Sequence, residues 1–187
     1  MAGGTAVQAG TSVWRLDPAH SSVEFAVKHM MMTTVRGRFK SVSATLTGDE
    51  THPEACCVEA EMDVASIDTG VADRDAHLRG PDFFDAEQYP KIHFVSKRLE
   101  GDFDREGDTF RVIGDLTMLD QTMEVVLSCE FEGHGNDPWG KERAGFSAHT
   151  DLDRREWGLR WNQAIETGGV LVANKVRLDV EVQFVRE

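Results

Sequence analysis

Hydrophobic and polar residues alternate along most of the chain from Val23 onward, which is the pattern of β-strands with one buried and one solvent-exposed face. In residues 58–64 valine, alanine and methionine alternate with glutamate and aspartate, and residues 176–184 repeat this pattern in the longest segment. Similar segments cover residues 23–27, 36–46, 92–94, 110–118, 125–131 and 146–152. Together they predict about eight strands, a number that closes into a barrel wide enough to hold a small ligand or its own side chains.

Most of the predicted strands are joined by short turns rich in Gly, Asp, Asn and Pro, which predicts antiparallel hairpins. Two connections are longer. Residues 68–90 begin with Asp and Thr, which are favourable helix caps, and predict a short helix around residues 73–78. Residues 153–174 form the second long connection. The sequence therefore predicts an all-β fold, an antiparallel barrel with one short helical excursion.

No internal repeat or linker divides the chain, so we expect one barrel domain over residues 14–187. Residues 1–13 are rich in Gly, Ala and Thr and are expected to form a flexible N-terminal tail. This tail lacks the basic and apolar regions of a secretion signal. The cysteines are three in number and have no CxxC spacing. We therefore expect a cytoplasmic protein without a structural zinc site.

The charge of the chain narrows the possible partners. Asp and Glu number 33 against 20 Lys and Arg, which gives a formal net charge of -13. Such a surface repels nucleic-acid phosphates and anionic lipid headgroups unless the fold gathers a local basic patch. No apolar stretch approaches the roughly 18 residues of a membrane-spanning helix. The hypotheses that remain are an enzyme and a protein that binds a small molecule.

The polar residues allow two chemical hypotheses. The seven histidines form no HxxxH or HExxH pair, so a helix-borne metal site is not expected. His20 and His77 each have a nearby aspartate, which suggests a general base acting on an apolar substrate. Ser21 follows His20 directly, but neighbouring strand residues point to opposite faces, which disfavours a nucleophile and base pair. We favour a structural role for these residues.

His29 and the three methionines after it suggest a haem or soft-metal site as a second hypothesis. In a continued strand, Met31 alone of the three shares the face of His29. Methionine is also a common filler of irregular apolar cavities. The phenylalanines and tryptophans fall mostly on inward positions, where they either fill a core or line an apolar cavity, and the pattern alone does not distinguish these two roles.

The order of short motifs is distinctive: WRLDPAHS at 14–21, KH at 28–29, VRGRF at 35–39, SIDT at 66–69, DAHL at 75–78, DFFD at 82–85, YPKIHFVS at 89–96, GDLT at 114–117 and RREWGL at 154–159. From Trp14 to the C-terminus the chain resembles the YceI-like family of lipocalin-like, polyisoprenoid-binding proteins. The resemblance implies an eight-stranded antiparallel barrel with a long isoprenoid lipid in its interior. It also implies a protein that often forms a homodimer and works without catalysis or a cofactor.

The resemblance also proposes site residues. The proposed ligand-binding residues are Phe25, Val27, Lys28, His29, Met31, Arg36, Phe39, Phe83, Phe84, Phe94, Phe146, Arg154, Trp157 and Trp161. The proposed structural polar residues are Asp17, His20, Ser21, Asp75 and His77. Lys28, Arg36 and Arg154 would neutralise a phosphate or quinone oxygen, and the alternative is an ion-pair network of these cations with Asp17 and Asp75.

This chain departs from the family pattern after GDLT. Relatives commonly have His-Gly and then Thr-Lys there, whereas this chain has Leu119-Asp120 and Thr122-Met123. The expected function is binding, carriage or sequestration of a long apolar ligand, a polyisoprenoid or an isoprenoid quinone-like lipid. The alternatives are the general-base enzyme and the haem or metal barrel.

Overall fold

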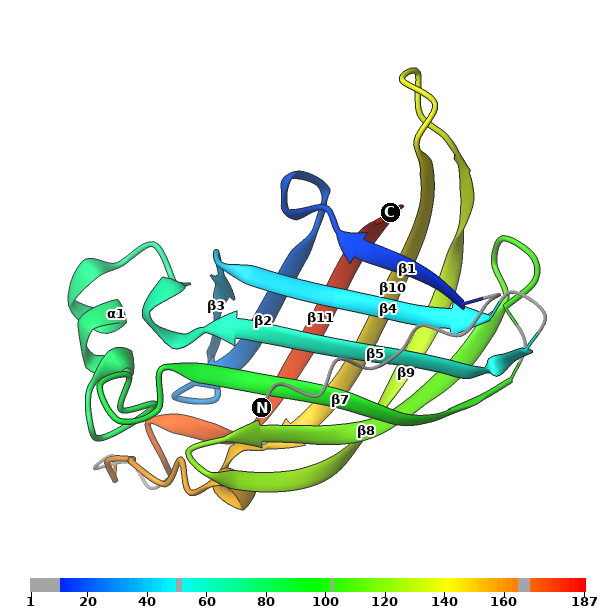
Figure 1. Ribbon diagram of the computed structural model, residues 1–187. Helices are drawn as coiled ribbons and strands as arrows, with labels where there is room; N and C mark the ends of the chain where they lie inside the picture. Colours follow the sequence, from blue (N-terminus) through cyan, green and yellow to red (C-terminus); the bar gives the residue numbers. More distant parts are fainter. Residues whose placement is uncertain (1–10, 50–51, 102, 165–168) are drawn as a thin grey trace, which may run out of the picture.

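The computed structural model describes residues 11–49, 52–101, 103–164 and 169–187. Eight strands of this part form a closed antiparallel ring, because each pairs with the next and β1 also pairs with β11. In ring order they are β1 (Thr11–Leu16), β4 (Val42–Asp49), β5 (His52–Asp63), β7 (Lys91–Glu100), β8 (Thr109–Met118), β9 (Gln121–Asn136), β10 (Glu142–Asp153) and β11 (Val172–Arg186). Figure 1 shows these strands wrapping around a common axis. The predicted eight-stranded barrel is confirmed.

Three further strands, β2 (Ser22–His29), β3 (Thr33–Phe39) and β6 (Ile67–Asp68), extend the sheet beyond β11. β1 and β2 lie along the same edge of β11, so they are two halves of one wall strand. The 3-10 helix η1 (Pro18–His20) separates them, and the side chain of Asp17 caps it by accepting from the backbone N of Ala19. The single strand predicted at residues 36–46 is divided in the same way, into the end of β3 and most of β4.

The N-terminal boundary differs from the prediction. β1 begins at Thr11, so residues 11–13 belong to the barrel wall rather than to a tail, while residues 1–10 lie outside the described residues. The hydroxyl of Ser12 is buried and donates to the carbonyl of Gly48 at 3.2 Å. It also accepts from the indole Nε1 of Trp14 at 3.0 Å. A buried polar residue interrupts the apolar alternation, which is why the pattern did not reveal this strand.

The predicted helical excursion is confirmed as α1 (Ala72–Arg79), which lies after the short 3-10 helix η2 (Val64–Ser66) and β6. The Arg79 guanidinium ties α1 to the barrel by donating to the carbonyls of Ala65 at 2.9 Å and Ile67 at 2.8 Å. We call the end of the barrel that carries α1 the helical end, seen at the left in Figure 1. Within the described ranges, no helix is long and apolar enough to cross a membrane.

The opposite end of the barrel carries the β7–β8 loop at residues 101–108 and the β9–β10 turn at residues 137–141. We call it the loop end, and its β9–β10 hairpin projects at the top of Figure 1. Between the two ends the predicted alternation holds. In β8, for example, Phe110, Val112, Leu116 and Met118 are buried, whereas Thr109 and Arg111 are exposed. Ile113 is the exception in this strand, because it occupies an outward position and is nevertheless fully buried. The barrel interior is therefore the hydrophobic core.

Candidate functional site

An apolar cavity of about 170 Å³ lies inside the barrel. Its walls come from all eight ring strands, from β2 and from the β7–β8 loop. Among the described residues no charged side chain lines it, and the lining residues that carry a polar side-chain atom are one threonine and two cysteines. The lining residues are Leu16, Val23, Val42, Ala44, Leu46, Cys56, Val58, Ala60, Met62, Phe94, Leu99, Phe103, Phe110, Val112, Leu116, Val125, Leu127, Cys129, Phe146, Ala148, Thr150, Leu178, Val180, Val182 and Phe184.

The volume of this cavity sets what fits without rearrangement. A protein cavity of about 150 Å³ with apolar walls stays dry and binds a molecule of the size of benzene. The 170 Å³ present here therefore holds a small apolar group or a short segment of a chain. A long chain must extend out of the barrel or displace side chains of the lining.

Five phenylalanine rings pack together at the loop end, and we call them the phenylalanine cluster: Phe103, Phe110, Phe131, Phe146 and Phe184. All of them except Phe131 line the cavity. The ring centroids of Phe103 and Phe110 are 5.0 Å apart, and those of Phe131 and Phe146 are 5.3 Å apart. Phe103 is the member that lies in a loop rather than in a strand. It is half-buried and reaches the cavity from the β7–β8 loop, so a movement of this loop would open the cavity at this end.

A second group of rings packs at the helical end. Phe39 contacts Phe25 and Phe84, with centroid distances of 5.9 and 6.0 Å. The His77 ring packs edge-on against Phe83 at 5.0 Å and against Trp161 at 4.8 Å. None of these six side chains lines the cavity. They pack against one another at the helical end rather than forming the cavity wall.

Of the fourteen residues proposed as ligand-binding, Phe94 and Phe146 line the cavity. The Phe94 ring lies directly over Gly114, where a Cβ atom would come within 2.6 Å of the ring and of the Val95 carbonyl oxygen. Gly114 occupies an inward position of β8, and its missing side chain leaves room for Phe94. The sequence alternation placed Gly114 inward, but the reason for a glycine there becomes clear only from this contact.

The proposed residues of the β2–β3 hairpin do not line the cavity. Phe25 and Val27 lie on its inner face, whereas Lys28 and Arg36 are exposed on its outer face. His29 ends β2 and is half-buried. Met31 is 67% exposed and has a positive φ of 58°, so the expected continuation of the strand alternation through Met31 is wrong. A tight turn begins directly after His29 and separates the two proposed haem or metal ligands.

Arg154 and Trp157, which belong to the 3-10 helix η3 (Arg154–Trp157), are buried and anchor the connection to β11. The Arg154 guanidinium donates to the carbonyls of Leu159 at 2.6 Å and Ala173 at 3.0 Å. Burial lowers its pKa, and the neighbouring Asp153 carboxylate opposes this effect. The indole of Trp157 donates to the Leu116 carbonyl at 2.9 Å. Both side chains therefore hold the backbone of this connection in place.

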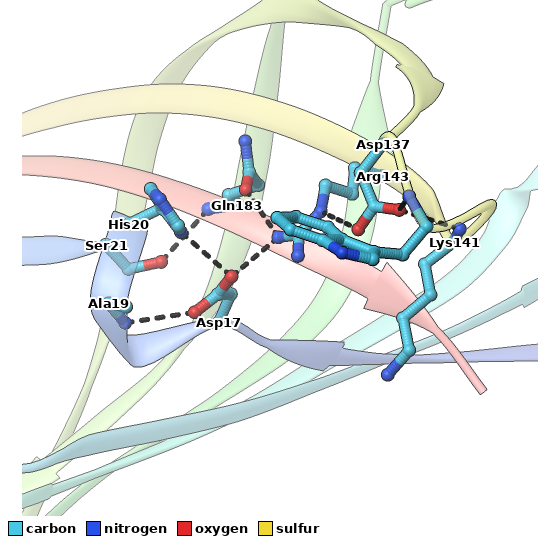
Figure 2. A network of polar contacts seen from close by, with 9 residues as sticks. Asp17, Ala19, His20, Ser21, Asp137, Lys141, Arg143 and Gln183 are labelled. Carbon is cyan, nitrogen blue, oxygen red and sulfur yellow. Dashed lines mark hydrogen bonds and ion pairs between the residues drawn. The ribbon is translucent and has the colours of Figure 1, made fainter.

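Asp17 belongs to a polar network that joins the β1–β2 kink to β10 and β11 (Figure 2). Its Oδ2 accepts from Arg143 Nη1 at 2.6 Å and pairs with His20 Nδ1 at 2.9 Å. These two contacts, Arg143 first, lower the pKa of Asp17 from its ordinary 3.8 to about 2. The Ser21 hydroxyl accepts from the Gln183 backbone N at 3.0 Å, and the Gln183 side chain accepts from Arg143 at 2.7 Å. The network fixes the kink.

The partner of Asp17 is therefore Arg143, a residue that the sequence analysis did not select. Asp75 Oδ1 accepts from the backbone N and the hydroxyl of Thr69, at 2.9 and 2.5 Å. The alternative expectation, ion pairs of Asp17 and Asp75 with Lys28, Arg36 and Arg154, is wrong, because the fold gives the two aspartates other partners. The separation of Asp17 and Arg143 by 126 positions explains why the pair could not be found in the sequence.

Both histidines proposed as general bases have an aspartate within hydrogen-bonding distance. His20 pairs with Asp17, and His77 Nε2 pairs with Asp82 Oδ2 at 3.0 Å rather than with its neighbour Asp75. Neither histidine lines the cavity. An apolar substrate in the barrel would therefore not meet either imidazole.

Several lining residues were not predicted as ligand contacts from the sequence. Phe110, Cys129 and Phe184 were placed correctly on inward faces but were not selected as ligand contacts, whereas Phe103 lies in a loop without periodicity. Cys129 is the most chemically informative of them. Burial raises the pKa of its thiol from 9.0 to about 12, so the thiol stays protonated and unreactive near neutral pH.

Comparison with known proteins gives a consistent result. The sequence profile of the YceI-like domain matches residues 14–184. A UPF0312 protein of Staphylococcus epidermidis is 34% identical over 172 residues, which cover 91% of this chain and 96% of that protein.

Solved structures share the fold. BcnA of Burkholderia cenocepacia superposes with a TM-score of 0.76 at 24% identity, covering 90% of this chain and 98% of that one. A polyisoprenoid binding domain from Saccharophagus degradans superposes with a TM-score of 0.68 at 13% identity, covering 96% of this chain and all of that one. The profile match and the curated relative show that the chain belongs to the YceI-like family.

Proposed function

We propose that this protein binds a long apolar molecule, a polyisoprenoid or an isoprenoid quinone-like lipid, in the barrel, and carries or sequesters it without catalysis. The observation that carries the proposal is the cavity, whose walls are apolar on every side and contain no charged group among the described residues. The name of the Saccharophagus degradans domain, which has the same fold, supports an isoprenoid ligand.

Burial of apolar carbons is sufficient for such binding. Each methylene-sized unit removed from water contributes about 0.8 kcal/mol. Roughly ten carbons therefore offset several kcal/mol of lost translational and rotational freedom, within the range of about 4–15 kcal/mol for association. A chain of this length exceeds the 170 Å³ cavity, so we propose that the phenylalanine cluster rearranges around Phe103 to admit it.

The polar end of the ligand stays in water under this proposal. Lys28 and Arg36 lie on the outer face of the β2–β3 hairpin, and Arg154 already donates to backbone carbonyls. The tail alone therefore supplies the binding energy. Ligands with the same tail and different head groups are expected to bind with similar affinity.

Two finer expectations accompany the proposal. A reducing compartment such as the cytoplasm suits Cys56, Cys57 and Cys129, which all lie in the described part of the chain and form no disulfide. The homodimer implied by the family resemblance stays a prediction. Light scattering of the eluting protein during gel filtration measures it.

Two experiments test the ligand. Mass spectrometry of lipids extracted from protein purified from its own host should find a bound isoprenoid, and a protein that copurifies with no lipid and binds none in titration would contradict the proposal. Ala148→Phe places a ring in the cavity and should abolish binding. Ser147→Phe is the matched control. Ser147 directly precedes Ala148 in β10 and faces outward, so this variant should bind the ligand as wild type does.

A further inference from the structure

The turn between β2 and β3, residues Met30–Met32, exposes large apolar side chains at the helical end of the barrel. Met31 is 67% exposed and Met32 is 70% exposed. The backbone N of Met30 donates to the Leu171 carbonyl at 2.8 Å, so the turn lies beside the segment that contains Val170, which is 39% exposed. We call these exposed side chains, Met31, Met32 and Val170, the apolar tip.

The backbone of this turn is strained. Met30 and Met31 have positive φ angles of 50° and 58°, a conformation that tight hairpin turns usually assign to Asn or Gly. The left-handed region costs a residue with a Cβ roughly 1–2 kcal/mol. Met31 is therefore held in water at a position where glycine or asparagine would be less strained, and such strain is typical of functional sites.

Two cations that have no carboxylate partner in the described part of the chain lie next to the tip on the β2–β3 hairpin. Lys28 pairs with Thr34 and Arg36 pairs with Ala26 in the β2–β3 ladder, so both side chains project from the same outer face. They are diagonal neighbours, a relation in which residues of an antiparallel pair are typically about 7–8 Å apart. Within the described ranges, neither forms an ion pair.

Three other cations around this face are neutralised. Lys40 pairs with Asp68, Lys175 with Asp151 and Arg177 with Asp179, each at 2.8 Å. Arg38, two residues after Arg36 on the outer face of β3, also forms no ion pair among the described residues, but it lies opposite Glu24. Of the three cations on the hairpin, Lys28 and Arg36 lie nearer to the turn. They form a local basic patch on a chain whose net charge is -13.

The geometry points to a membrane-docking surface: the apolar tip inserts between the headgroups of an anionic lipid bilayer while Lys28 and Arg36 bind the phosphates. Exposed apolar side chains flanked by cations are the combination that binds proteins to such surfaces. The negative charge elsewhere on the molecule is repelled by the same surface, which orients the barrel with its helical end toward the lipid.

The loop end offers a less suitable surface. Trp139 in the β9–β10 turn is 83% exposed. The neighbouring cations Arg143 and Arg186 are paired with Asp137 and Glu142, at 2.9 and 2.8 Å. Trp139 therefore serves as a control for an exposed hydrophobic side chain at the opposite end of the barrel, with paired cations on the neighbouring strand ends.

Flotation with lipid vesicles tests the docking surface directly and needs no ligand in the cavity. The protein should float with phosphatidylcholine vesicles that contain phosphatidylglycerol and not with pure phosphatidylcholine vesicles, and added salt should release it. Lys28→Gln with Arg36→Gln should weaken binding about 25-fold, which is about fivefold for each cation removed. Met31→Ser with Met32→Ser should also weaken binding.

Matched variants at the loop end complete the test. Arg105→Gln with Lys141→Gln removes two exposed cations, and Trp139→Ser removes the exposed indole; both variants should bind the vesicles as wild type does. Absence of flotation with anionic vesicles, equal flotation with neutral vesicles, or an equal loss in the loop-end variants would each overturn the proposal. Binding of vesicles by a protein that takes up no lipid in titration would support docking while contradicting the proposed ligand.

Discussion

Removing the charge of Asp17 tests the network at the β1–β2 kink. The pKa of Asp17 is lowered from 3.8 to about 2 by Arg143 and His20, and its side chain is only 15% exposed. At about 1.4 kcal/mol for each pH unit, the lowered pKa corresponds to roughly 2 kcal/mol of folding free energy. Asp17→Asn should therefore lower the free energy of unfolding at neutral pH by about 2 kcal/mol.

The pH dependence of stability shows whether the charged form of Asp17 stabilises the fold. A carboxylate whose pKa is lower in the folded state stabilises the fold above the unfolded pKa, and this stabilisation disappears as the pH falls through the folded pKa. The difference between wild type and Asp17→Asn should thus be complete above about pH 4 and vanish near pH 2.

Urea unfolding followed by tryptophan fluorescence measures both quantities. Asp179→Asn is the control, because Asp179 belongs to an ion pair whose partners are 48% and 41% exposed. Such an exposed pair should contribute less than about 1 kcal/mol. If Asp17→Asn is as stable as Asp179→Asn at neutral pH, or its deficit persists near pH 2, the assignment of this network as a stabilising element is wrong.

Two further predictions concern the turn and the cavity. Met31→Gly should raise the free energy of unfolding by about 0.5–1 kcal/mol, because glycine adopts the positive φ without strain and Met31 makes little buried contact. The same variant should bind vesicles more weakly. A lower stability of this variant in thermal unfolding would contradict the reasoning. Cys129 should react slowly with a small thiol reagent near neutral pH, and the rate should rise about tenfold for each pH unit toward its pKa of about 12. Mass spectrometry of the Cys56→Ser, Cys57→Ser double variant measures this rate. Fast labelling of Cys129 near neutral pH would show that the cavity is wet.

The strands were predictable because each has one face on the core. Alternation over Val58, Ala60 and Met62, or over Phe110 and Val112 in β8, follows directly from burial of a single face. β1 escaped prediction because Ser12 occupies an inward position and its hydroxyl is satisfied by Gly48 and Trp14. A buried polar residue carries no periodic signal, although its partners make it stable in the fold.

The candidate site was predictable only where a strand defined a face. Phe94 and Phe146 were selected in alternating segments and line the cavity, whereas Phe103 reaches it from a loop. Lys28 and Arg36 belong to motifs of the family, but membership of a motif does not state the face on which a side chain lies. The β2–β3 register places both outside the barrel. Long-range partners such as Asp17 and Arg143 depend on the closed ring and have no local signal.

The most direct test of lipid binding is the crystal structure of the protein purified from its own host. The proposal predicts continuous, elongated electron density between Phe94 and Phe146 that extends past Phe103 at the loop end. A barrel interior filled by its own side chains, from protein that releases no lipid on extraction, would contradict it.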